Sequence, residues 1–137
     1  MEGIIDYLRR PVLRIETPPP HSDGLRCQID TRFNRFLLLE QSVARRFGFE
    51  GRRGSVQDQI VLGDGSIRFA WLARGTILWF GAPLIVEAHI VPSSRQPGYV
   101  SPEFQIDALI GTALLDGLRV VLDFRRRQLT ISRSDDE

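Results

Sequence analysis

Short stretches of alternating apolar and polar residues run through most of the chain, and the clearest covers residues 25–30. Its order, Leu-Arg-Cys-Gln-Ile-Asp, places an apolar side chain at every second position, which predicts a half-buried strand. Asp30 ends this stretch on its polar side, and Thr31 follows it. The alternation stops over residues 31–35, and the apolar run 36–39 predicts a second, buried strand. The pattern therefore predicts a carboxylate and a hydroxyl at a turn between two strands.

Similar patterns along the rest of the chain predict further short elements. Strands are predicted over residues 11–16, 56–62, 66–72, 76–80, 84–91, 106–110, 118–124 and 128–132. Gly63-Asp64-Gly65 and Gly81-Ala82-Pro83 are strong turn signals between them. Short helices are predicted over residues 41–47 and 113–116, the second with Thr112 as its N-cap. Residues 1–10 fit either a short amphipathic turn or an extended arm.

This succession of short strands predicts an all-β domain, most simply a closed or nearly closed barrel with one or two short helices. The chain has 137 residues and 42% hydrophobic content, enough for one ordinary core. We divide it into an N-terminal arm (1–10), a single domain (11–132) and a polar tail (133–137).

Composition excludes several classes of function. The formal net charge is +1, and all 18 basic residues are arginine, so no global field favours nucleic acid or an acidic membrane. Local arginine clusters at Arg52, Arg53 and residues 125–127 adjoin only one aromatic residue, Phe124, which is poor support for stacking on bases. We therefore expect no nucleic-acid partner. No run approaches the ~20 apolar residues of a membrane span, and residues 1–14 lack the apolar core of a signal peptide. We expect no membrane association and a cytoplasmic location.

The few metal-ligating side chains predict no metal site and no cofactor. Cys27 is the only cysteine, which excludes an internal disulfide and a cysteine-based zinc site and favours a reducing compartment. The two histidines, His21 and His89, are too few for a histidine cage. In the strand 84–91, Glu87 and His89 share one face, which predicts an exposed polar face and no catalytic role for His89.

The order of these parts resembles the retropepsin family, the retroviral-type aspartic proteases and their small bacterial relatives. Three pieces carry the resemblance: Ile29-Asp30-Thr31, the Gly-Asp-Gly-Ser hairpin at residues 63–66, and Leu-Ile-Gly-x-x-Leu-Leu-x-Gly-Leu beginning at Leu109. The resemblance extends from about residue 11 to residue 131, nearly the whole chain.

The resemblance implies a homodimeric aspartic endopeptidase without a cofactor. Each chain would supply one aspartate, Asp30, because the chemistry needs two carboxylates that share one proton. Thr31 would brace the two loops across the dimer axis, and residues 61–69 would form a flap over a polypeptide substrate. The implied substrate contacts are Arg32, Leu62, Gly63, Asp64, Gly65 and Ser66, and the implied supports of the catalytic loop are Leu109, Ile110 and Gly111.

Arg32 departs from the family pattern, which has glycine after Asp-Thr. Its side chain would crowd the symmetry mate and the bound peptide, and its permanent charge favours ionisation of both carboxylates over the single-proton state. Arg35 stands where relatives often have a second glycine. Two functions are consequently open: an active homodimeric endopeptidase, and a catalytically inactive domain that binds peptides or proteins as a dimer.

Overall fold

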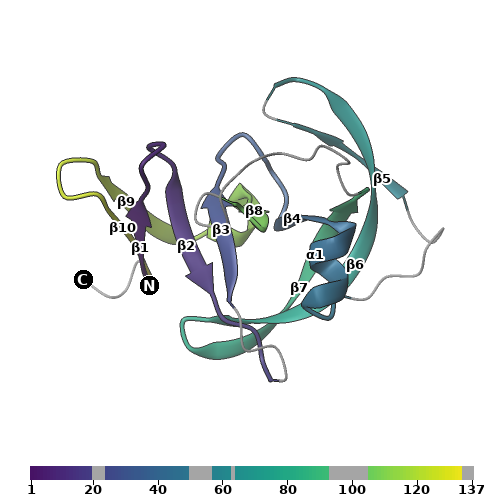
Figure 1. Ribbon diagram of the computed structural model, residues 1–137, viewed down its shortest axis with the longest axis horizontal. Helices are drawn as coiled ribbons and strands as arrows, with labels where there is room; N and C mark the ends of the chain where they lie inside the picture. The colour runs from purple at the N-terminus through teal and green to yellow at the C-terminus, as the bar shows by residue number, and fades with distance from the viewer. Residues whose placement is uncertain (20–23, 50–56, 63, 93–104, 134–137) are drawn as a thin grey trace.

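Ten strands and two short helices make up the computed structural model (Figure 1), which describes residues 1–19, 24–49, 57–62, 64–92 and 105–133. The elements are β1 (Glu2–Ile5), β2 (Pro11–Ile15), β3 (Leu25–Ile29), β4 (Leu37–Glu40), α1 (Gln41–Arg46), β5 (Gln57–Val61), β6 (Ile67–Trp79), β7 (Ala82–Val91), β8 (Ala108–Ile110), α2 (Thr112–Leu115), β9 (Leu118–Asp123) and β10 (Gln128–Arg133). The predicted all-β class with two short helices is confirmed.

The strands form one sheet in the order β5-β6-β7-β4-β8-β3-β2-β1-β10-β9. β5 and β9 are its two free ends in the described part of the chain, so the sheet is nearly closed and not fully closed. Most neighbours are antiparallel, but β3 pairs with β8, and β4 with β7, in parallel. β8 therefore lies between β3 and β4, although it follows them by about 70 residues in the chain.

The structure decides one alternative that the sequence left open and changes one prediction. Residues 1–10 are an extended arm that contains β1, which pairs with both β10 and β2. The predicted strands 66–72 and 76–80 form one strand, β6, which passes through Gly75 without a break. A Cβ at Gly75 would lie 2.5 Å from the ring of Phe49, so this glycine makes room for an aromatic ring and does not end the strand.

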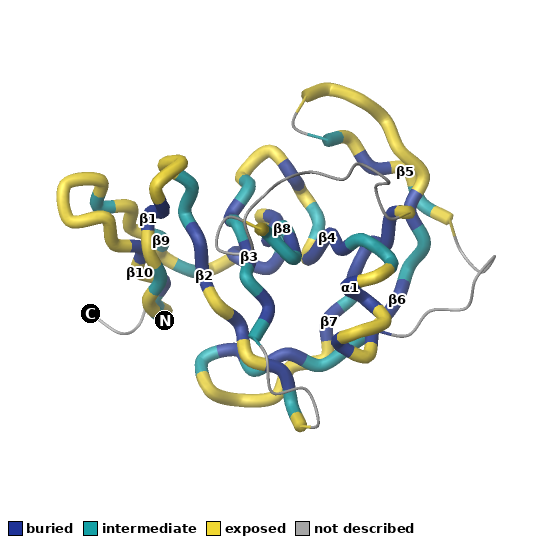
Figure 2. Tube along the Cα trace, in the orientation of Figure 1, coloured by how far each residue is buried: buried dark blue, intermediate teal, exposed yellow. Residues whose placement is uncertain are grey.

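β7 contributes residues to two hydrophobic cores, and its C-terminal half is mostly buried (Figure 2). Ala88 and Ile90 belong to the larger core, and Val91 belongs to a smaller one, which also contains Phe33, Leu38, Ile60 and Ala70. His89 alternates with Ala88 and Ile90, points toward the smaller core and is 0% exposed. The predicted exposed face at His89 is therefore wrong, because β7 is an interior strand covered on both sides.

The prediction for Thr112 is also wrong. Thr112 is the first residue of α2, and Gly111 precedes it as the N-cap without a side-chain cap. The Thr112 hydroxyl lies instead 3.5 Å from the carbonyl oxygen of Phe33. Several predictions fall outside the described residues: those for His21, Arg52, Arg53, Gly63 and residues 134–137.

Candidate functional site

Asp30 immediately follows β3, and its backbone is fixed on both sides. Its N–H donates to the carbonyl oxygen of Ile110 at 3.0 Å, and its own carbonyl accepts from the N–H of Phe33 at 3.1 Å. The side chain is 11% exposed, and its Oδ1 accepts from the N–H of Arg32 at 3.0 Å. This local Asx-type bond orients the carboxylate at the mouth of the loop that joins β3 to β4.

The start of α2 and the end of β8 hold that loop from behind. The N–H of Gly111 donates to Phe36 at 3.0 Å, the N–H of Thr112 donates to Phe33 at 2.8 Å, and the N–H of Ala113 donates to Arg35 at 3.3 Å. Four backbone bonds, including the one from Asp30 to Ile110, thus tie the loop to the segment 110–113. The structure places Leu109, Ile110 and Gly111 directly behind Asp30.

Gly111 is the point of closest approach between these two segments. A Cβ at this position would meet the carbonyl oxygen of Arg35, and would lie 2.7 Å from the carbonyl oxygen and the ring of Phe33. The φ of Gly111 is −93°, which any residue can adopt. Glycine is needed here for space and not for an unusual backbone conformation.

Thr31 and Arg32 lie on the outside of the loop. Both residues are exposed, and the Arg32 side chain is 70% exposed, with its Nε 3.4 Å from Asp30 Oδ1. Arg32 does not have positive φ: in the described chain only Arg9, Phe80 and Arg127 do so among non-glycine residues. Within one protomer, arginine is therefore accommodated after Asp-Thr without backbone strain, and its charge lies beside the carboxylate.

The hairpin of β5 and β6 contains the predicted flap. Leu62 and Ser66 are bonded across its turn at 2.8 Å, and Asp64 Oδ1 accepts from the Ser66 N–H at 2.9 Å and from its hydroxyl at 2.6 Å. The bonds from Ser66 lower the pKa of Asp64. Asp64, Gly65 and Ser66 are exposed. They therefore form an outward-facing tip whose aspartate orders the turn.

The part of this hairpin that contains Ile60 and Leu62, here called the hairpin root, contacts the Asp30 loop through the smaller core. Phe33 from the loop is 1% exposed and clusters with Ile60 of β5, and Leu62 and Leu109 pack against that cluster. In Figure 1 the loop between β3 and β4 and the β5–β6 hairpin both lie along the upper edge of the molecule. The structure thus brings Leu62 and Leu109 to the Asp30 loop, whereas residues 64–66 form the exposed tip of the hairpin.

The structure adds three residues that the sequence did not mark as a group: Arg35, Asp58 and His89. Asp58 Oδ2 lies 3.0 Å from His89 Nε2 and 3.2 Å from a terminal nitrogen of Arg35. The bond from His89 and the charge of Arg35 lower the pKa of Asp58 despite partial burial, which acts in the opposite direction. The sequence marked His89 and Arg35 separately, and it gave no signal that Asp58 would join them.

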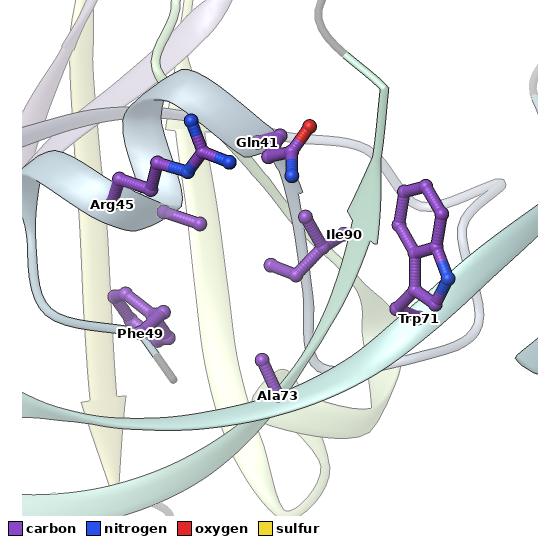
Figure 3. Close-up of a pocket in the computed structure, with 7 residues that line it drawn as sticks. Gln41, Arg45, Phe49, Trp71, Ala73 and Ile90 are labelled. Atoms are coloured by element: carbon purple, nitrogen blue, oxygen red, sulfur yellow. The ribbon is translucent and has the colours of Figure 1, made fainter. Parts of the chain in front are cut away.

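A small cavity opens between α1 and the sheet (Figure 3). Its volume is about 170 Å³, and its lining combines apolar side chains with two polar ones: Gln41, Ala44, Arg45, Phe49, Trp71, Ala73 and Ile90. None of these residues belongs to the Asp30 loop or to the β5 strand of the hairpin. Trp71 and Ala73 belong to β6, the other strand of this hairpin, so the cavity lies beside the hairpin and outside the Asp30 loop.

Cys27, the single cysteine, is not a reactive group. The Cys27 thiol is fully buried, and burial followed by the charge of Asp107 raises its pKa, so it is not a nucleophile at neutral pH.

The described residues contain no group of three or more metal-ligating side chains. No helix in the described ranges is long and apolar enough to cross a membrane.

Comparison with known proteins finds a likeness in structure but not in sequence. Neither the known protein families nor the curated proteins include a match to this sequence. Among solved structures, the chain is similar to the retroviral protease-like domain of Ddi1 from Leishmania major, with 9% identity and a TM-score of 0.49. The alignment covers 93% of this chain and 94% of the Ddi1 domain.

Proposed function

We propose that this chain is one half of a homodimeric, retropepsin-like aspartic endopeptidase, with Asp30 as the catalytic group. The observation that carries the proposal is the way in which backbone hydrogen bonds hold Asp30 and its loop in place. A carboxylate ends a rigid strand, with its loop bonded from behind by a parallel strand and the helix start after it. Such support holds a carboxylate within the narrow tolerance that a paired site requires.

The chemistry requires a second Asp30 from another copy of the chain. Two carboxylates at hydrogen-bond distance share one proton, because like charges so close together cannot both ionise. The ionised one takes a proton from a water molecule, whose oxygen attacks the peptide carbonyl carbon, while the protonated one donates to the carbonyl oxygen. The tetrahedral intermediate then collapses, and the C–N bond breaks as the leaving nitrogen gains a proton.

The first test measures cleavage of an unfolded polypeptide across acidic to neutral pH, together with the native mass of the protein. The wild-type protein is expected to be a dimer, and Asp30→Asn is expected to lower the cleavage rate by at least about 10²-fold, because a general acid–base group is lost.

Asp123→Asn is the matched control for this test. Asp123 also ends a strand and accepts a backbone N–H, that of Arg126, at 3.0 Å. This variant is expected to cleave at the wild-type rate. A monomeric active protein, or cleavage that survives Asp30→Asn, contradicts the assignment.

A second candidate function, an inert peptide-binding dimer, is favoured by one contact. The guanidinium of Arg32 lies 3.4 Å from Asp30 Oδ1, and a fixed positive charge at that distance favours ionised carboxylates over a shared proton. The dimer would then bind an extended polypeptide without hydrolysing it.

Arg32→Gly separates the two functions. If the positive charge of Arg32 prevents catalysis, the cleavage rate of Arg32→Gly is expected to rise by at least about tenfold. A tenfold change in rate needs only a small change in electrostatic free energy. Arg125→Gly, which removes an arginine from the exposed turn after β9, is the control and is expected to change nothing. A wild-type protein that binds peptide, with an Arg32→Gly variant that folds and stays inert, supports the binding module.

A further inference from the structure

A polar cluster joins three parts of the molecule around the proposed site. Asp58 lies on β5, the outer strand of the hairpin, His89 lies on β7, and Arg35 lies in the loop that contains Asp30. One oxygen of Asp58, Oδ2, contacts both partners, His89 Nε2 at 3.0 Å and Arg35 at 3.2 Å. The pair between Arg35 and Asp58 connects the hairpin to the Asp30 loop.

Burial determines the protonation pattern of this cluster. His89 is 0% exposed, and its Nδ1 is buried without a hydrogen-bond partner among the described residues. A proton on Nδ1 would leave a buried donor unsatisfied, which is more costly than an unpaired acceptor. Nε2 is therefore the nitrogen that donates to the Asp58 carboxylate, and Arg35 approaches the same carboxylate oxygen.

Apolar contacts also join the Asp30 loop to β7 and to the hairpin. The ring of Phe33 meets the His89 ring edge-on, with centroids 6.3 Å apart and planes at 87°. Phe33 also clusters with Ile60, two residues beyond Asp58 on the same face of β5. The Asp30 loop and the root of the hairpin are thus linked by a polar cluster and by a shared core.

Arg35 couples this cluster to the backbone behind Asp30. Its carbonyl oxygen accepts from the N–H of Ala113 and lies against Gly111, while its guanidinium reaches Asp58. A shift of the hairpin root would therefore also displace Arg35, whose backbone closes the Asp30 loop. This gives a physical reason for arginine at a position where a glycine would break the connection.

We propose that Arg35, Asp58 and His89 are positioning residues that set the orientation of the β5–β6 hairpin relative to the Asp30 loop. The proposal rests on the proposed function in that the hairpin is taken to cover a polypeptide at Asp30. The three residues do not touch the reacting atoms. They act by keeping the hairpin root and the Asp30 loop in a fixed position relative to each other. That position determines how tightly an extended substrate is bound.

Amide hydrogen exchange on the full chain tests this coupling without any need for activity. Arg35→Gln and Asp58→Asn are expected to raise exchange together at hairpin and loop amides by about tenfold or more, as a local opening becomes easier. The reporting amides are those of Leu62, Phe33 and Thr112. The double variant is expected to exchange no faster than either single variant, because both remove the same interaction.

Conservative variants and a remote ion pair provide the controls. Arg35→Lys and His89→Gln keep a cation and a donor within reach, and are expected to stay within about threefold of the wild-type exchange rates. His89→Leu, which removes the donor, is expected to behave like Asp58→Asn. Arg14→Gln breaks an exposed pair with Glu16 of 3.2 Å and is expected to leave all three amides unchanged.

The outcomes separate this proposal from the proposed function. If hairpin and loop amides respond independently, or if neither responds to Arg35→Gln and Asp58→Asn, positioning by this cluster is refuted even in an active enzyme. If they respond together in a protein that cleaves nothing, positioning stands and the peptidase assignment fails. In an active enzyme, coupling further predicts that KM rises by about tenfold while kcat changes less than threefold, since substrate holding and not chemistry is weakened.

Discussion

Replacing Gly111 with alanine is expected to destabilise the fold by at least about 2 kcal/mol, because the new Cβ overpacks a site already in contact with backbone atoms. The obstructing groups are the carbonyl oxygens of Arg35 and Phe33. These are backbone atoms of the Asp30 loop, so relief of the clash must displace the loop itself. The expected measurements are a lower midpoint in chemical denaturation and loss of exchange protection at the Thr112 amide, which donates to Phe33.

Gly117→Ala is the matched control for this prediction. Gly117 has a φ of +74°, and a Cβ there would have nothing within 4 Å. Its cost is therefore conformational only, about 1 kcal/mol. A Gly111→Ala variant that is as stable as the wild-type protein, or more stable than Gly117→Ala, would show that the loop and the segment behind it are not packed as described.

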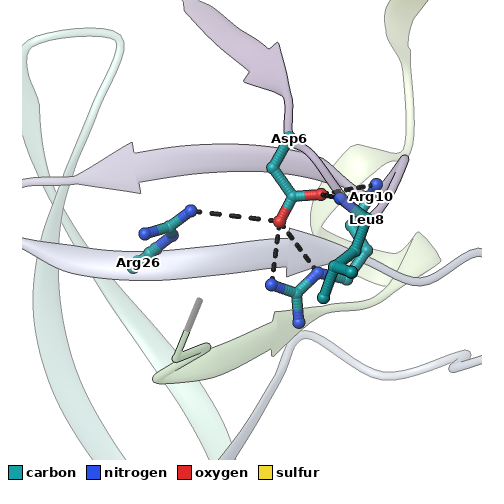
Figure 4. A network of polar contacts seen from close by, with 4 residues as sticks. All are labelled: Asp6, Leu8, Arg10 and Arg26. Carbon is teal, nitrogen blue, oxygen red and sulfur yellow. Dashed lines mark hydrogen bonds and ion pairs between the residues drawn. The ribbon is translucent and has the colours of Figure 1, made fainter. Parts of the chain in front are cut away.

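Asp6→Asn is expected to cost about 3 kcal/mol, the size typical of breaking a buried ion pair by removing one partner. The Asp6 side chain is 3% exposed and accepts from the backbone N–H of Leu8 and Arg10 (Figure 4). Its Oδ2 also lies 2.8 Å from the Arg10 guanidinium and 3.9 Å from that of Arg26. The substitution would leave two partly buried arginines facing an amide, and would loosen the turn between β1 and β2.

The same carboxylate makes stability depend on pH. Burial by itself raises the pKa of Asp6, but the bonds and the charge of Arg10 outweigh this and hold the pKa below its usual value. The folded protein therefore binds fewer protons at Asp6 than the unfolded chain does. Its contribution is full above about pH 5 and is lost as pH falls through the unfolded value, near 4, and then through the lower folded value.

Denaturation of the wild-type protein and Asp6→Asn between about pH 3 and pH 7 measures this contribution. The difference in stability between them is expected to shrink as the solution becomes more acidic. Glu16→Gln is the control, because Glu16 is 52% exposed in its pair with Arg14, and exposed pairs contribute at most about 1 kcal/mol. A constant difference across this range would contradict the assigned role of Asp6.

The Asp30 strand and the hairpins were predictable from local patterns alone. Alternation over residues 25–30 predicted β3 with Asp30 at its end, and Gly63-Asp64-Gly65 predicted the turn after β5. Such features depend on neighbours within a few residues, because strand periodicity and turn chemistry are local properties. The all-β class with two short helices followed from the same patterns.

Tertiary structure decided what surrounds those local elements. The position of β8 between β3 and β4, and the complete burial of His89 on β7, depend on strands that are distant in the chain. A pattern of alternation shows which side chains share a face, but it does not show whether the opposite face is also covered.

Sequence by itself therefore determined that this protein delivers the carboxylate of Asp30 at the end of a strand. Only the tertiary structure decided that Arg35 is paired with Asp58 across the hairpin root. It also decided that Arg32 fits beside Asp30 without strain in one protomer. The physical reason is that a side chain's steric and electrostatic effects depend on partners that only folding brings within contact distance.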